Sequence, residues 1–241
     1  MKLKTKLFIH QNIPYSFNWN KQHHKNIYSQ ITSNREELNK LKLHFKRVYN
    51  GLIPNYLFNS RNLPRISQFK IRGIKSAFIK SFSKKLIRTG QIELSGSNSK
   101  LPQHAQNVME IFKVNKIQGI PGHEPILKNI LIKDKNSIAI EVPVWNEAEN
   151  KLITGHIDLI QVENDVVKVI DYKPEGNFLY SLPQVAMYGF LLKEKLKIKN
   201  LKCISFNKHE AWEYDPLILL SDIKDYLISH RINERPWEDY L

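Results

Sequence analysis

Five side chains in the central part of the sequence have the types and spacing of a site that cleaves phosphodiester bonds. Asp158 is followed by Asp171, and Lys173 comes two residues after this second aspartate. Gln184 and Tyr188 come next, four residues apart. Carboxylates that converge beside a lysine are typical of sites in which a divalent cation assists hydrolysis.

The segments that carry the aspartates predict an antiparallel hairpin. Residues 151–160 and 166–173 are short and rich in β-branched residues, and residues 161–165 between them include turn formers. Side chains alternate along a strand, so Asp171 and Lys173 share a face. The hairpin can therefore bring two carboxylates and an ammonium group into one small volume.

Such a pair of acids needs a compensating charge. Two carboxylates held close together repel, and one of them tends to take up a proton. Mg²⁺ or Mn²⁺ removes this conflict, because hard cations prefer carboxylate, carbonyl and water oxygens. The ion would lower the pKa of a bound water, and Lys173 would orient or deprotonate that water or stabilise the transition state as a point charge. We therefore expect Mg²⁺ or Mn²⁺ between Asp158 and Asp171.

A helix completes this group of residues. Ser181 is a candidate N-cap, and the proline that follows two residues later suits a first helical turn. Gln184 and Tyr188 then lie on one helix face. Gln184 can hold Lys173 or a phosphate, and Tyr188 can hydrogen-bond to a phosphate or a metal-bound water.

Three motifs in this order resemble the PD-(D/E)XK nuclease superfamily, specifically its RecB-like exonuclease branch. They are Gly155-His-Ile-Asp158, Asp171-Tyr-Lys173 and the Gln184 to Tyr188 segment, which match G-x-x-D, D-x-K and Q-x-x-x-Y. The resemblance covers roughly residues 100–210. It implies a restriction-endonuclease-like α/β core, with a central mixed β-sheet flanked by helices, metal binding at Asp158 and Asp171, and catalytic assistance from Lys173. The chain departs from the usual pattern at Pro174, where the branch commonly has a threonine.

The resemblance also bears on a further metal ligand and on iron–sulfur clusters. The branch usually carries a histidine on an upstream helix, and here His104 is the best placed, as a third candidate ligand. A rival placement, residues 73–82, has Ala77 where that histidine would be. Members that hold an iron–sulfur cluster need four cysteines. This chain has only Cys203, so we expect no such cluster.

Composition indicates an intracellular protein with an uneven charge distribution. The apolar fraction of 41% is sufficient for a packed core, and a single cysteine fits a reducing cytoplasm. We expect no signal peptide and no membrane span, because every apolar run is too short. Residues 1–133 have a net charge of +19 and residues 134–241 one of −5. A basic region outside an acidic metal site suits a nuclease, although a generally lysine-rich surface is the alternative.

The chain divides into two expected parts. Residues 1–100 are expected to form a basic, mostly helical N-terminal extension that holds DNA, and residues 101–241 the nuclease core. Residues 66–88 are the first choice for contacts with phosphates. Residues 90–100 read as a flexible loop that separates the parts, but a continuous domain with an extended lobe fits equally well.

The first core strand is expected at residues 137–145. Ile140 and Val142 should face one way, and Glu141 the other. Glu141 is either a further acid near the metal or, in the favoured interpretation, a structural glutamate at an edge.

These observations predict a metal-dependent deoxyribonuclease, an exonuclease on single-stranded or end-containing DNA in repair, recombination or replication. The preference for such DNA comes from the resemblance. The alternatives are a nucleic-acid-binding module without catalysis and an RNA-directed nuclease of the same fold. The sequence has no G-x-x-x-x-G-K-[ST] loop, so a helicase or another DNA-processing partner in a separate chain would have to supply any unwinding.

Overall fold

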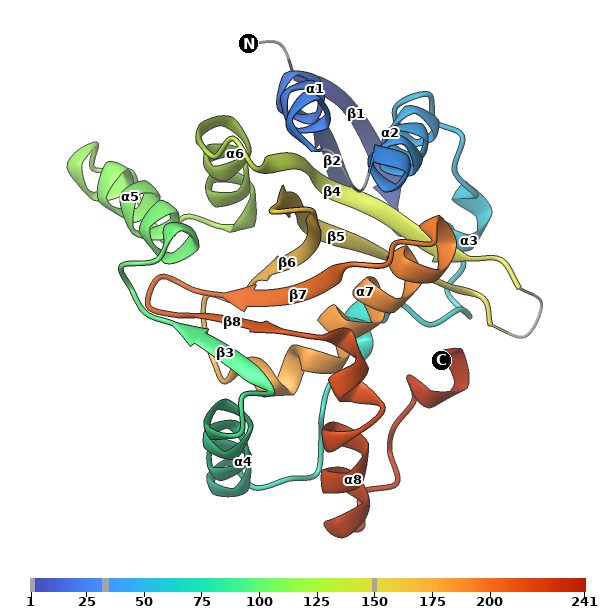
Figure 1. Ribbon diagram of the computed structural model, residues 1–241, viewed down its shortest axis with the longest axis vertical. Helices are drawn as coiled ribbons and strands as arrows, with labels where there is room; N and C mark the ends of the chain where they lie inside the picture. The colour runs from blue at the N-terminus through green and yellow to red at the C-terminus, as the bar shows by residue number, and fades with distance from the viewer. Residues whose placement is uncertain (1–2, 32–34, 149–150) are drawn as a thin grey trace.

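One β-sheet of eight strands runs through the structure, a computed structural model that describes residues 3–31, 35–148 and 151–241 (Figure 1). The spatial order of the strands is β1-β2-β4-β5-β6-β7-β8-β3. Neighbouring strands are antiparallel, apart from the parallel pair β6 and β7. The fold is therefore α/β with a mixed sheet. The strands are β1 (Lys4–His10), β2 (Ile13–Trp19), β3 (Ile92–Ser95), β4 (Ser137–Asn146), β5 (Ile153–Glu163), β6 (Val166–Tyr172), β7 (Leu201–Phe206) and β8 (Ala211–Tyr214).

Helices flank the sheet and bury two hydrophobic clusters against it. The larger cluster includes residues of α1, α2, α3, α4, α7 and α8, and the smaller includes residues of α5 and α6. The two faces of β6 enter different clusters: Val167 and Val169 belong to the larger, and Ile170 and Tyr172 to the smaller, as the twofold period of a strand requires. The helices are α1 (Lys21–Gln30), α2 (Arg35–Tyr49), α3 (Asn55–Asn59), α4 (Ser76–Arg88), α5 (Lys100–Val114), α6 (His123–Lys133), α7 (Leu182–Leu196) and α8 (Asp222–Ser229), with 3₁₀ turns η1 (Ile66–Gln68), η2 (Phe178–Ser181), η3 (Pro216–Leu219) and η4 (Glu238–Tyr240).

The first 100 residues contribute strands as well as helices. The β1–β2 hairpin pairs with β4 at one edge of the sheet, and β3 pairs with β8 at the other. The expectation of a flexible loop over residues 90–100 was wrong at β3. Ile92 is buried, and its strand forms a regular antiparallel ladder with β8, so tertiary pairing overrides the loop-forming composition around it.

The helix α7 connects the two parallel strands. Parallel neighbours need a crossover, and α7 passes from the end of β6 to the start of β7 across the face of the sheet (Figure 1). It packs against β4, β5, β6 and β7, and its residues are buried almost throughout. This position brings Gln184 and Tyr188 beneath the ends of β5 and β6. In the described part of the chain, no helix is both long enough and apolar enough to cross a bilayer.

Candidate metal-dependent active site

The predicted hairpin is formed by β5 and β6. Its turn consists of Asn164 and Asp165, which both have positive φ angles, +49° and +63°. Two consecutive left-handed residues match a tight two-residue hairpin turn. The turn is shorter than expected, so β5 extends to Glu163. Asp158 consequently lies in the middle of β5, whereas the sequence placed it near a strand end.

Asp158 lies where the two strands separate. The last paired residues are Leu159 and Ile170, and continuation of this register places Asp158 opposite Asp171. Asp158 Oδ2 accepts a hydrogen bond of 3.0 Å from the backbone N–H of Tyr172. The carboxylate thus satisfies a backbone donor at the point where the ladder ends, which fixes its position.

Asp171, Lys173, Gln184 and Tyr188 form one hydrogen-bonded group. Lys173 Nζ lies 2.7 Å from Asp171 Oδ2 and donates to Gln184 Oε1 at 3.2 Å. The amide nitrogen of Gln184 contacts both Asp171 Oδ1 and Tyr188 Oη at 3.3 Å. The structure therefore brings together these four predicted residues, from the end of β6 and the first turns of α7.

Gly155 joins the first motif to the third. A Cβ atom at this position would lie 2.5 Å from Tyr188 Cε1 and 3.2 Å from side-chain atoms of Ile66. Only a residue without a side chain permits this approach between β5 and α7. The glycine thus allows Tyr188 to pack under the strand and to support Gln184.

His123 is a site residue that the sequence interpretation missed. It is the first residue of α6, and its Nδ1 lies 3.2 Å from Asp158 Oδ2. Its ring also packs edge-on against Tyr172 at a centroid distance of 5.3 Å. The side chain of His123 is 44% exposed, that of Asp158 13% and that of Asp171 1%, so the group extends from solvent into the protein.

Glu141 also belongs to this group. It lies between Ile140 and Val142, which pair with Leu159 and Ile157, so the register places it opposite Asp158. Its φ of +52° is rare for a residue with a side chain.

The strand changes phase at Glu141. Ile140 packs in the smaller hydrophobic cluster, but Val142 packs in the larger one. The expectation that Ile140 and Val142 share a face was therefore wrong, because the left-handed residue between them rotates the strand.

The three carboxylates strongly influence one another. Burial and the nearby Asp158 raise the pKa of Asp171 to about 7, although Lys173 opposes this shift. Burial, followed by the charges of Asp158 and Asp171, raises the pKa of Glu141 to about 8. Hydrogen bonding to Asp158 raises the pKa of His123. Burial thus disfavours the ionised forms of Asp171 and Glu141, and the neighbouring carboxylates add to this effect.

The chemistry of these side chains fits a hard divalent cation. Asp158 and Asp171, with Glu141 at their side, offer carboxylate oxygens, and His123 adds an imidazole nitrogen. Because burial and the neighbouring carboxylates raise the pKa values of Asp171 and Glu141, a cation placed here would favour their ionised forms. Among the described residues, no three His, Cys, Asp or Glu side chains already converge as a ligand set.

His104, the third ligand that the resemblance suggested, lies on α5. Within the described part of the chain it has no hydrogen bond or ion pair to Asp158 or Asp171, and its Nδ1 is buried without a partner. Its role as a ligand stays a prediction. His123, at the start of the next helix, is the histidine that contacts Asp158.

Comparisons with known proteins identify no relative of this chain. No protein-family model matches the chain, and neither a curated protein nor a solved structure matches it. The interpretation of this site therefore depends on its own geometry.

Proposed function

We propose that the protein is a divalent-metal-dependent deoxyribonuclease with a restriction-endonuclease-like core. The observation that carries the proposal is the meeting of Asp158, Asp171 and Lys173 at the open end of a hairpin. Two further acidic or imidazole groups, Glu141 and His123, surround them. Asp158 and Glu141 lie beside the Asp171–Lys173 pair, and a cation site needs such a group of carboxylates.

Each side chain has a role that its contacts support. Asp158 and Asp171 would hold Mg²⁺ or Mn²⁺, which when bound polarises the scissile phosphate and lowers the pKa of a water molecule. Lys173 has three N–H donors, of which Asp171 and Gln184 engage two. The remaining donor can orient the attacking water or contact a phosphate oxygen. Gln184 acts through Lys173 and Asp171 as a positioning residue.

The basic character of residues 1–133, with a net charge of +19, supports a polyanionic substrate. The residues 66–88 that we expected to contact phosphates form η1, the following segment and α4. Lys80, Lys84 and Lys85 have no ion pair in the described part of the chain. Such lysines are available to a phosphate backbone. We favour single-stranded or end-containing DNA as the substrate.

The test is digestion of labelled DNA with Mg²⁺, with Mn²⁺ and with EDTA. Single strands with a blocked 5′ end, a blocked 3′ end or no ends, together with matched RNA strands, distinguish exonuclease from endonuclease and DNA from RNA. We expect metal-dependent cleavage of DNA that falls by roughly 100-fold or more in Asp171→Asn and in Lys173→Ala.

Lys202→Ala is the matched control, because the one ion pair that Lys202 forms with the described residues is a partly exposed contact with Asp215. Near-ultraviolet circular dichroism establishes that each variant is folded. Binding of DNA by wild type without cleavage under any of these conditions would refute the enzyme and favour a binding module. Cleavage of RNA alone would refute the choice of substrate.

A further inference from the structure

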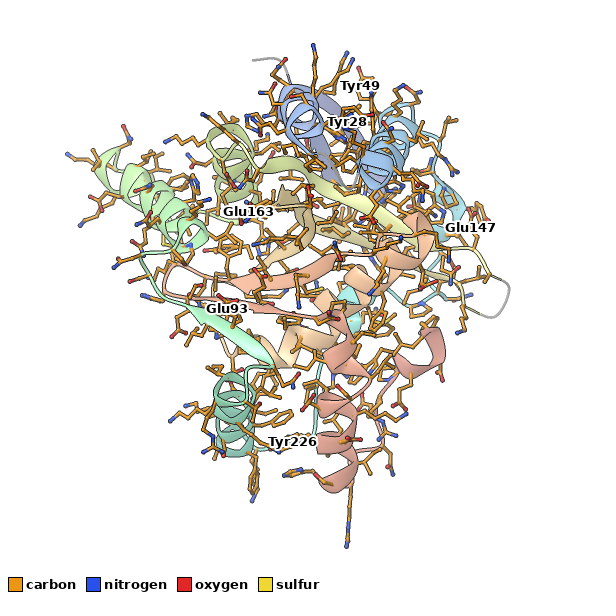
Figure 2. All side chains as sticks on the ribbon, viewed as in Figure 1. Tyr28, Tyr49, Glu93, Glu147, Glu163 and Tyr226 are labelled. Carbon is orange, nitrogen blue, oxygen red and sulfur yellow. The ribbon has the colours of Figure 1, made fainter. Side chains whose placement is uncertain are left out.

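A cavity separate from the carboxylate group lies on the N-terminal helices α1 and α2 and the end of β2. Its volume is about 920 Å³, within the usual range for a small-molecule site. Its lining includes Trp19, His24 and Tyr28 together with three lysines, and none of these residues belongs to the carboxylate site. Tyr28 lies at the end of the molecule formed by α1 and α2 (Figure 2).

The base of this cavity is aromatic and uncharged. Trp19 Nε1 donates to His24 Nδ1 at 3.3 Å, so the other ring nitrogen of His24 donates to the Leu38 carbonyl at 3.1 Å. Burial lowers the pKa of His24 to about 4, which keeps this ring neutral. With these polar atoms engaged, the buried rings of Trp19 and His24 form an apolar floor beneath the cavity.

Tyr28 forms a fixed aromatic wall. Asn39 on α2 donates to Tyr28 Oη at 3.3 Å, and the guanidinium group of Arg35 lies 5.9 Å from the ring centroid. Both contacts come from α2, although Tyr28 belongs to α1. They hold the ring in one orientation, which favours stacking against a flat ligand.

The rim of the cavity is cationic. Lys21, Lys25 and Lys42 are exposed, and in the described residues none of them forms an ion pair. Lys21 and Gln22 belong to the first turn of α1, which has no acidic residue. The partial positive charge of a helix N-terminus adds to the three ammonium groups. The rim is therefore complementary to an anion such as a phosphate.

We propose that this cavity binds one nucleotide, with its base against Tyr28 and its phosphate between Lys25 and Lys42. A flat apolar surface beside unpaired lysines matches the two parts of such a ligand. Stacking on an aromatic side chain and phosphate contacts to lysine are the usual components of nucleotide binding. The choice of a nucleotide over other anionic aromatic molecules rests on the proposed nuclease function. The nucleotide is either free or one unit of a strand.

The experiment is calorimetric titration in EDTA, at constant ionic strength, so that the carboxylate site holds no metal and nothing is cleaved. The ligands are 2′-deoxyadenosine 5′-monophosphate, deoxyadenosine, inorganic phosphate and a six-residue oligo(dA). The monophosphate should bind more tightly than either the nucleoside or phosphate alone. Lys25→Gln/Lys42→Gln and Tyr28→Leu should each weaken its binding about tenfold.

The control Lys113→Gln/Lys116→Gln removes the same charge from exposed lysines of α5 and its C-terminal end, and should change affinity by less than about twofold. If the pocket variants weaken binding of the oligonucleotide more than binding of the monophosphate, the natural ligand is one unit of a strand. If they weaken binding of the monophosphate more, it is the free nucleotide. No saturable binding of either ligand, or equal losses in pocket and control variants, would overturn the proposal.

Failure of this proposal is distinguishable from failure of the nuclease function. A protein that cleaves DNA but binds no nucleotide in EDTA would lack this pocket function and keep the active site. Pocket-dependent nucleotide binding by a protein that cleaves nothing would support the pocket and refute the nuclease function.

Discussion

Gly155→Ala should destabilise the protein, chiefly through a close contact with Tyr188. The added methyl carbon would lie 2.5 Å from Tyr188 Cε1, about 1 Å closer than two carbon atoms normally approach. Tyr188 cannot move aside freely, because it is 2% exposed and its hydroxyl contacts Gln184. A displaced tyrosine would also disturb the glutamine that holds Lys173, so the proposed nuclease activity should fall as well.

Two opposing effects determine how much Gly155→Ala changes the free energy of unfolding. Overpacking in a core costs about 1–3 kcal/mol, and replacement of glycine by alanine restores about 0.4–1 kcal/mol by restricting the unfolded chain. The free energy of unfolding should therefore decrease by about 1–2 kcal/mol. Tyr188→Leu removes the ring that the methyl group meets. In the double variant, the loss should be smaller than the sum of the two single losses by about 1 kcal/mol or more.

Equilibrium unfolding in urea of the wild type, both single variants and the double variant measures this coupling. Gly96→Ala is the matched control, because a Cβ atom there meets nothing within 4 Å. It should change stability by less than about 0.5 kcal/mol. Losses that add to within about 0.5 kcal/mol in the double variant would refute the contact between β5 and α7.

Three other predictions concern pH, metal and packing. Burial lowers the pKa of His44 to about 4, so its neutral form stabilises the fold above pH 6.5 and this contribution is lost as the pH falls towards 4. We expect the free energy of unfolding in urea to fall with decreasing pH between 6.5 and 4. Its slope should be smaller for His44→Gln than for wild type by about 1.4 kcal/mol per pH unit, and equal slopes would contradict the lowered pKa of His44. Mg²⁺ or Mn²⁺ should raise the melting temperature of wild type. At about pH 9, above the pKa of about 8 of Glu141, Glu141→Gln removes a buried negative charge, so it should raise the melting temperature in EDTA and reduce the gain from metal; a destabilised Glu141→Gln in EDTA at that pH would contradict this reasoning. Gly189→Ala should decrease stability by about 1–3 kcal/mol in thermal unfolding, because its Cβ atom would lie 2.6 Å from Cys203 Sγ; a neutral effect would refute this close packing.

Short-range features of the site could be predicted from the sequence because local geometry determines them. Asp171 and Lys173 share a strand face, and Gln184 and Tyr188 share a helix face, whatever the rest of the chain does. The hairpin was predictable from its β-branched segments and the turn formers between them. The exact length of the hairpin was not predictable, because turn formers are spread over residues 161–165. The structure uses only Asn164 and Asp165 for the turn.

The contributions of His123 and Glu141 depend on tertiary structure. His123 is 35 residues from Asp158, and only the packing of α6 brings it to the carboxylate. A signal was present in the glycine before it, which marks a helix start, but this does not specify what the helix faces. Glu141 enters the site through a left-handed backbone in a strand, a conformation that the alternation of apolar residues does not reveal. The edge strand β3 was hidden for a similar reason, since pairing with β8 is a long-range interaction.

The balance of charge provides the physical argument for a ligand at this site. Lys173 compensates Asp171 directly, and His123 contacts Asp158, but Glu141 has no cation of its own there in the described part of the chain. A cluster that served stability alone would be improved by replacing one of its acids with an amide, because burial of like charges is unfavourable. Burial and the neighbouring carboxylates raise the pKa values of Asp171 and Glu141, so both acids keep a proton to a higher pH than usual, and a bound cation would displace it. Metal binding, rather than the ion pair alone, is therefore the property that the catalytic proposal requires.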